Sequence, residues 1–265
     1  MSVRDAYLAV HRQGWIPIFP RDGFDALFLA DACAEAGASV IEVTCRRPAV
    51  VDEIKRIKGR HPSLRILVGS TVDFDEMVRF NRQRGGHLPT LDELADLGVD
   101  GFVSQLPLRL ETIVKYRDSH VLMPGVETGT EAYRVVADGA HFAKIYAASL
   151  FGGPDYIRAI TAAPTHGLLP IFVTGGVSRE KIRGYLGARA ISLGAGWDLM
   201  LGERHKPLQE APVLSELVET LSAYMREFDS ARREFYPALT EALSGSDEAY
   251  LRAIPHYHPF ANESK

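Results

Sequence analysis

Short runs of apolar and β-branched residues alternate along the chain with longer segments whose apolar positions recur at helical spacing. Eight of these runs are expected to be strands: 16–19, 39–43, 65–68, 101–103, 120–123, 141–146, 169–173 and 190–193. Several of them lack polar alternation, which is typical of parallel strands that are covered on both faces. The repeated order of strand and helix, with eight strands, favours a (β/α)8 barrel over a doubly wound open sheet.

One interval between strands is longer than the others. The segment between the third and fourth predicted strands is longer than the other connections, and the additional residues lie at 72–90. They are expected to form an insertion on the face where barrel enzymes bind substrate. It contains Arg79, Arg82 and Arg84, which cannot all share one helical face, so at least one is expected to point toward the site or a neighbouring subunit. The segment is interpreted as a lid, a subunit contact or a solvated extra turn.

After Trp197 the alternating pattern gives way to one apolar stripe at helical spacing, formed by Leu214, Leu217, Val218, Leu221, Met225 and Phe228. The proline-rich end at 254–260 cannot continue this helix and is expected either to dock on the barrel or to stay loose. Its two histidines, His256 and His258, are interpreted as surface residues rather than metal ligands. The chain is therefore expected to consist of a barrel over residues 1–204 and a C-terminal helical extension and tail over residues 205–265.

Composition excludes several classes of protein. A length of 265 residues is usual for one α/β barrel. Thirty basic and 34 acidic side chains give a net charge of −4, which argues against a nucleic-acid partner. The start of the chain lacks a secretion signal and no stretch is long enough to span a membrane, so no membrane partner is expected. Two cysteines, Cys33 and Cys45, cannot form a disulfide framework, and a cytoplasmic location is expected.

Lys144 is a charged residue inside the sixth predicted strand, where strand alternation places it on one face with Phe142 and Tyr146. Neither face of a barrel strand meets bulk water, and desolvation lowers the pKa of an amine because it disfavours the charged form. A neutral amine is a nucleophile toward carbonyl groups. A buried ion pair, or a lysine whose ammonium reaches solvent at the strand end, fits the same position, so these interpretations stay open.

Glu42 is the corresponding acid in the second predicted strand, where it shares a face with Thr44 and Arg46. A carboxyl group in an apolar setting has its protonated form favoured, which suits proton transfer near neutral pH. Arg46 follows the strand end, where its guanidinium can bind a carboxylate through two hydrogen bonds. Alternatively, Glu42 only pairs with Lys144 or Arg46. Cys45 has the opposite parity and is expected to pack against the surrounding helices.

Two glycine clusters follow the last two predicted strands. Residues 174–176 read Thr-Gly-Gly, and residues 194–197 read Gly-Ala-Gly-Trp. Barrels often bind phosphate at these two loops, because glycine allows backbone N–H groups to approach an anion. Together the clusters indicate an anion site, with tight turns as the alternative.

Taken in order, these motifs resemble one family. They read Glu-Val-Thr-Cys-Arg at 42–46, Gly-Ser-Thr-Val at 69–72, Met-Pro-Gly-Val at 123–126 and Lys-Ile-Tyr at 144–146, followed by the two glycine clusters. Over roughly residues 14–200 their order and spacing are similar to those of the 2-keto-3-deoxy-6-phosphogluconate (KDPG) and 4-hydroxy-2-oxoglutarate (KHG) aldolases. Each motif alone is weak, whereas their co-occurrence is specific.

The resemblance implies a class I aldolase on a (β/α)8 barrel that cleaves a small-molecule 2-keto-4-hydroxy acid to pyruvate and an aldehyde. It implies no metal and no other cofactor, and a homo-oligomer that is usually a trimer. By position, Lys144 would form the Schiff base and Glu42 would be the general acid/base. Arg46 and Thr71 would hold the pyruvate carboxylate. The remaining substrate-binding residues would be Tyr146, beside the lysine, and Thr174, Gly175, Gly176, Gly194 and Gly196, toward the distal end of the substrate.

The chain also departs from the family pattern. Gly196 stands where the phosphogluconate enzymes usually offer a serine hydroxyl to the substrate phosphate, so one phosphate donor is missing. Family prolines are replaced near Gln105 and at Ala147, and the insertion and the long tail are not typical. These departures indicate a divergent branch with altered aldehyde specificity.

Two other functions stay open from the residues alone. A barrel with this lysine can use its imine for dehydration or decarboxylation of a 2-keto acid, or it can be a catalytically silent barrel that binds a keto acid or phosphate. Burial of both a lysine and a glutamate destabilises the fold unless the pair has a function, which favours an enzyme.

Overall fold

The computed structural model describes residues 2–262, apart from the side chains of residues 163, 164 and 262, and its centre is a sheet of nine parallel strands. The strands are β1 (Trp15–Phe19), β2 (Val40–Thr44), β3 (Arg65–Gly69), β4 (Gly101–Val103), β5 (Val121–Met123), β6 (Gly125–Val126), β7 (Ala143–Ile145), β8 (Ile171–Val173) and β9 (Ser192–Gly196). Their order across the sheet is β5-β4-β3-β2-β1-β9-β8-β7-β6.

The two ends of this sheet are joined by a single residue, Pro124. Because proline has no N–H to donate, it interrupts the ladder, and the strand pairs with β4 before the proline and with β7 after it. β5 and β6 therefore make one interrupted strand that closes the barrel. The predicted (β/α)8 barrel is confirmed, and each of the eight predicted strand segments overlaps a barrel strand.

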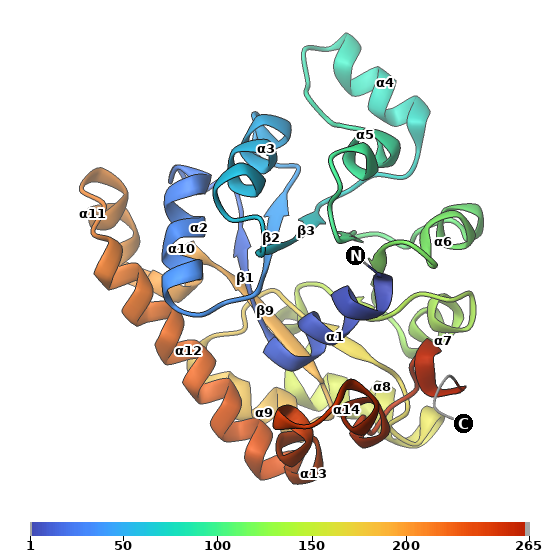
Figure 1. Ribbon diagram of the computed structural model, residues 1–265. Helices are drawn as coiled ribbons and strands as arrows, with labels where there is room; N and C mark the ends of the chain where they lie inside the picture. The colour runs from blue at the N-terminus through green and yellow to red at the C-terminus, as the bar shows by residue number, and fades with distance from the viewer. Residues whose placement is uncertain (1, 263–265) are drawn as a thin grey trace.

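Helices lie around the strands on the outside of the barrel and, from the two ends of the chain, across one end of it (Figure 1). They are α1 (Val3–Gln13), α2 (Ala26–Glu35), α3 (Val50–Arg60), α4 (Asp75–Gln83), α5 (Leu91–Asp96), α6 (Leu110–Tyr116), α7 (Gly129–Ala137), α8 (Pro154–Thr165), α9 (Ile182–Gly187), α10 (Trp197–Leu201), α11 (His205–Glu210), α12 (Leu214–Phe235), α13 (Pro237–Glu241) and α14 (Asp247–Ala253). No helix within residues 2–262 has both the length and the apolar character needed to cross a membrane.

Strand alternation divides the buried side chains into two layers. Phe142, just before β7, and Lys144 point into the barrel, while Ala143 and Ile145 pack in the layer between the strands and the helices. Cys45, just after β2, also packs in this outer layer, as expected.

The predicted long helix after residue 204 is α12, and it belongs to the helical ring. Its buried residues include Leu217, Leu221 and Phe228, which were part of the predicted stripe. α12 packs against both α2 and α9, the helices that follow β1 and β8 (Figure 1). α12 fills the space between α2 and α9. The domain boundary at residue 204 stays a prediction.

The insertion at 72–90 forms α4 and the turn before α5, and in Figure 1 it extends away from the barrel. The three arginines have partners in their own segment or in α5: Arg79 pairs with Glu76, Arg82 pairs with Glu93, and the Arg84 guanidinium lies 5.4 Å from the Phe80 ring centre. The expectation that at least one arginine points toward the site or a neighbouring subunit stays a prediction.

The other end of the barrel is closed by the two ends of the chain. Tyr7 from α1 packs against Phe142 from the barrel interior and against Phe260 from the C-terminal segment. The ring centre of Tyr7 lies 5.3 Å from each of the other two ring centres. The segment thus docks on the barrel, which decides between the two predicted alternatives. His256 and His258 are buried, so the expectation of a surface tail is wrong, because these rings fill the space beneath α1.

A histidine pair holds this end together. His11 Nε2 and His256 Nε2 lie 2.9 Å apart, and His256 Nδ1 donates to the Tyr257 carbonyl at 2.9 Å. With its Nδ1 proton used there, a neutral His256 accepts at Nε2 from His11. Desolvation lowers the pKa of His256 to about 4 and lowers that of His11 well below its usual value, so both rings stay neutral near pH 7.

We expect the protein to lose stability as the pH falls from about 6.5 toward 4. In this window an unfolded histidine binds a proton that folded His256 does not bind, so the free energy of unfolding decreases by up to ~1.4 kcal/mol per pH unit for each such ring. Urea unfolding at several pH values measures this slope, which should be smaller in His256→Gln. His87→Gln changes an exposed histidine and should keep the wild-type slope. Equal slopes in all three proteins would contradict the assignment.

Candidate active site

A cavity of about 280 Å³ opens at the carboxyl ends of the barrel strands, the place where barrel enzymes have their active sites. Its lining includes eight of the ten predicted site residues: Glu42, Arg46, Lys144, Tyr146, Thr174, Gly175, Gly176 and Gly196. The lining also contains Ile18, Pro20, Gln105, Ala195, Asp198 and Leu199. Residues that lie up to 181 positions apart in the chain are therefore brought to one cavity, from six of the strands and the loops that follow them.

The centre of the cavity is the pair formed by Lys144 and Glu42. Lys144 Nζ lies 3.5 Å from Glu42 Oε1, and the two side chains are 3% and 2% exposed. Burial excludes the interpretation in which the ammonium reaches solvent at the strand end. Desolvation lowers the pKa of Lys144, and the Arg46 charge lowers it further, while Glu42 opposes both effects. The lysine therefore carries a larger fraction of neutral, nucleophilic amine than a solvated lysine does.

Glu42 has one oxygen toward the lysine and one that is free. Its Oε2 atom is buried and has no hydrogen-bond partner among the described residues. A buried oxygen of this kind destabilises the fold unless a further group binds it, which suits a carboxylate that exchanges protons with a substrate. Gly69 makes room for this side chain, because a Cβ atom at position 69 would lie 2.0 Å from Glu42 Oε1.

Two neighbouring arginines have different surroundings. Arg46 is exposed at the cavity, and within residues 2–262 no carboxylate is paired with it. Arg47 is buried and donates to Glu53 at 2.7 Å and to Asp22 at 3.1 Å. Arg47 thus fixes the loop after β1 to the start of α3, whereas Arg46 is available for an anionic ligand.

Two predicted site residues lie outside the cavity. The Thr71 hydroxyl donates to the Val103 carbonyl at 3.1 Å, so its proton is not directed toward a ligand. Gly194 packs inside the barrel, where an added Cβ atom would lie 2.8 Å from the Ile16 carbonyl oxygen. Neither residue lines the cavity.

The loops after β7 and β8 cross closely beside the lysine. Gly175 has a φ angle of +82°, and a Cβ atom on it would lie 2.4 Å from the Ala147 backbone nitrogen. This glycine is required by the turn and by the close approach of the two loops. Thr174, just before it, has a buried hydroxyl without a partner among the described residues. The tight-turn explanation therefore accounts for the glycines at 175 and 176. The Thr174 hydroxyl is in addition available to bind a ligand in the cavity.

Sequence reasoning missed two polar residues of the lining, Gln105 and Asp198. Asp198 directly follows the Gly-Ala-Gly-Trp cluster, so its closeness to a predicted site residue was the available signal. Cys45 is not a nucleophile, because burial raises the pKa of its thiol to about 12. The described residues contain no group of three or more histidine, cysteine or acidic side chains placed to hold a metal ion.

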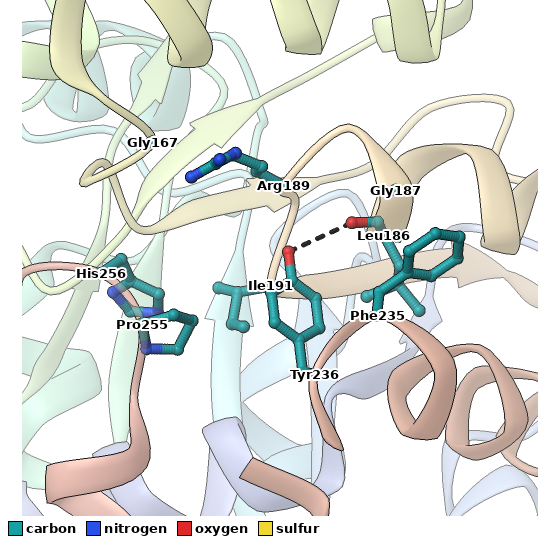
Figure 2. Close-up of a pocket in the computed structure, with 9 residues that line it drawn as sticks. All are labelled: Gly167, Leu186, Gly187, Arg189, Ile191, Phe235, Tyr236, Pro255 and His256. Carbon is teal, nitrogen blue, oxygen red and sulfur yellow. Dashed lines mark hydrogen bonds between the residues drawn. The ribbon is translucent and has the colours of Figure 1, made fainter. Parts of the chain in front are cut away.

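A second cavity of about 310 Å³ lies near the amino-terminal end of β9 and shares no residue with the first (Figure 2). Tyr236 stands in its middle and donates to the Leu186 carbonyl at 3.1 Å. Arg189 is the charged group in its lining and donates to the His166 carbonyl at 3.4 Å. This cavity lacks the nucleophile and the acid that the first one holds.

Comparisons with known proteins agree with the geometry of the first cavity. The sequence model of the KDPG and KHG aldolase family matches residues 16–206, which is most of the chain. The chain belongs to the KDPG and KHG aldolase family. It is 27% identical over 180 residues to a 2-dehydro-3-deoxy-phosphogluconate aldolase of Pseudomonas aeruginosa, covering 66% of this chain and 73% of that protein.

Two further proteins show the same relationship. A 2-dehydro-3-deoxy-6-phosphogalactonate aldolase of Escherichia coli is 27% identical over 178 residues, covering 66% of this chain and 78% of that protein. A crystal structure of KDPG aldolase from Legionella pneumophila, with pyruvate captured as a covalent carbinolamine intermediate, has a TM-score of 0.63 and 19% identity. It covers 83% of this chain and 97% of that one, and at this identity it supports the fold.

We expect Gly69→Ala to lower aldolase turnover by about 10²-fold or more while the fold is retained, because the added methyl group displaces the Glu42 carboxylate. Gly59→Ala is the matched control, since it adds a methyl group to α3 where no atom lies within 4 Å. Pyruvate release from a 2-keto-4-hydroxy acid measures turnover, and circular dichroism checks the fold. Wild-type turnover in folded Gly69→Ala would contradict the tight fit around Glu42.

Proposed function

We propose that this protein is a class I aldolase in which Lys144 forms a Schiff base with a 2-keto-4-hydroxy acid. The observation that carries the proposal is the buried contact of 3.5 Å between Lys144 and Glu42 inside an open cavity. The Legionella relative, in which pyruvate forms a covalent carbinolamine, supports the same chemistry here.

The proposed reaction begins when the Lys144 ammonium passes a proton to Glu42, with which it is in contact, and the neutral amine attacks the 2-keto carbon. The carbinolamine loses water, with Glu42 delivering the proton that the departing hydroxyl needs, and a protonated imine results. Glu42 then accepts the proton of the C4 hydroxyl while the C3–C4 bond breaks, and the bonding electrons move to the imine nitrogen. The aldehyde leaves, the resulting enamine takes up a proton at C3, and hydrolysis releases pyruvate and free Lys144.

Arg46 is assigned to the carboxylate of the keto acid, because it is the unpaired cation of the cavity lining. The family motif implies that Thr71 also binds this carboxylate, but its hydroxyl proton is directed to the Val103 carbonyl, so we assign the main contact to Arg46. Dehydration and decarboxylation would use the same imine, but the family of the chain favours cleavage of a carbon–carbon bond.

We expect pyruvate and borohydride to add one reduced three-carbon adduct to the protein, located on Lys144. Lys144→Ala should abolish the adduct, whereas Lys181→Ala should retain it, because Lys181 lies beside Gly176 but does not line the cavity. Mass spectrometry of the intact protein and of its peptides measures both results. An adduct on another lysine, or none on the wild type, would overturn the proposed function.

We further propose that the protein is a homo-oligomer whose copies meet at α4. Phe74, Met77 and Phe80 recur every three positions and are 45%, 49% and 57% exposed. No residue of 72–90 lines the active-site cavity, which supports a subunit contact over a lid of the same site. An apolar helix face that extends from the barrel suits contact with a second copy, and the trimer implied by the family resemblance agrees with it. Both cysteines are free, which suits a cytoplasmic location.

We expect the double variant Met77→Glu with Phe80→Glu to have a smaller mass in solution than the wild type, because charges disrupt an apolar interface. Light scattering after size-exclusion chromatography measures the mass. Val213→Glu, which alters another exposed apolar residue, should keep the wild-type mass. An unchanged mass in the double variant, with an oligomeric wild type, would place the interface elsewhere.

A further inference from the structure

We infer that Asp198 determines the substrate class, selecting 2-keto-4-hydroxy acids whose distal end carries free hydroxyls and rejecting those that carry a phosphoryl group there. The inference rests on the proposed function and adds to it the identity of the aldehyde half of the substrate.

Asp198 stands at the end of β9 and faces the cavity. It is in the first turn of α10, two residues after Gly196, and both residues line the cavity together with Thr174 and Gly176. A Cβ atom on Gly196 would lie 2.4 Å from Asp198 Oδ1. The carboxylate therefore occupies the space in which a side chain at position 196 would otherwise stand.

The charges of the lining divide unequally between the two ends of the substrate. The lining contains two cations, Lys144 and Arg46, and two carboxylates, Glu42 and Asp198. In the proposed reaction Lys144 becomes the imine, and Arg46 binds the carboxylate of the keto acid. Both cations are then used at the keto-acid end, and Asp198 remains toward the distal end.

A phosphoryl group fits this distal end poorly. It carries a charge of about −1.5 to −2 at pH 7, and it would face a carboxylate with no cation in the lining left to offset the repulsion. Lys181 is not part of the lining, and its ammonium donates to the Gly176 carbonyl oxygen at 3.5 Å. A hydroxyl group, in contrast, donates to a carboxylate through a strong, charge-assisted hydrogen bond.

Asp198 also has a structural explanation, because an acidic residue in the first turn stabilises a helix through its dipole. This structural role would affect the stability of α10 to the same extent whichever substrate is used. A change in the ratio of activities toward two matched substrates is therefore the readout that separates selection of substrate from support of α10.

The test compares kcat/KM for cleavage of 2-keto-3-deoxygluconate and of its 6-phosphate, which differ only in the phosphoryl group. We expect the wild type to favour the unphosphorylated acid, and Asp198→Asn to shift the ratio toward the phosphate by about 10- to 100-fold. Asp52→Asn is the matched control, since it removes an 80%-exposed carboxylate from the first turn of α3 and should leave the ratio unchanged. Because Asp198 is exposed, the wild-type ratio should also decrease as salt is raised.

The result that overturns the inference is a wild type that favours the phosphate, or an Asp198→Asn variant with the wild-type ratio. The pyruvate adduct on Lys144 is measured in the same preparations. If the adduct forms and the ratio does not change, the role of Asp198 is wrong and the aldolase stands. If no adduct forms in the wild type, the proposed function fails, and the inference fails with it.

Discussion

The arrangement of the active site depends on the burial of one lysine and one glutamate in the interior of the barrel. Two charges taken out of water destabilise a fold unless they pair, and the contact of 3.5 Å between Lys144 and Glu42 provides that pairing. The pair in turn requires space, which Gly69 supplies, and an open cavity, which the loops after β7, β8 and β9 surround. The same desolvation that makes the pair unfavourable for stability gives the lysine its nucleophilic amine.

The parts of this arrangement that depend on local pattern were predictable. Strand parity alone placed Lys144 and Phe142 on one face, and it placed Cys45 in the outer layer. The eight strands were recognisable because burial on both faces makes them apolar throughout. The position of Lys144 opposite Glu42 followed from no local pattern, since the two residues are 102 positions apart. The two residues meet because the barrel closes, and closure was predictable from the number of strands.

The differences between expectation and structure concern residues whose place depends on a neighbour from another part of the chain. The Thr71 hydroxyl, predicted to bind the substrate carboxylate, donates to the Val103 carbonyl of the adjacent strand, and its part in binding stays a prediction. Asp198 was missed because only the geometry of the turn after β9 shows that its carboxylate replaces a side chain at Gly196. The histidines of the C-terminal segment looked exposed, because the helix that covers them, α1, lies at the other end of the sequence.

That last contact has a consequence for the order in which the molecule acquires its structure during synthesis. His11 and His256 are 245 positions apart, and between them the chain ends seal the side of the barrel opposite the active site. The segment around His256 leaves the ribosome only after the whole barrel has been synthesised, so a nascent barrel has an unsealed interior until then. Contacts of such long sequence separation form slowly, and apolar side chains such as Phe142 remain accessible to chaperones during that interval.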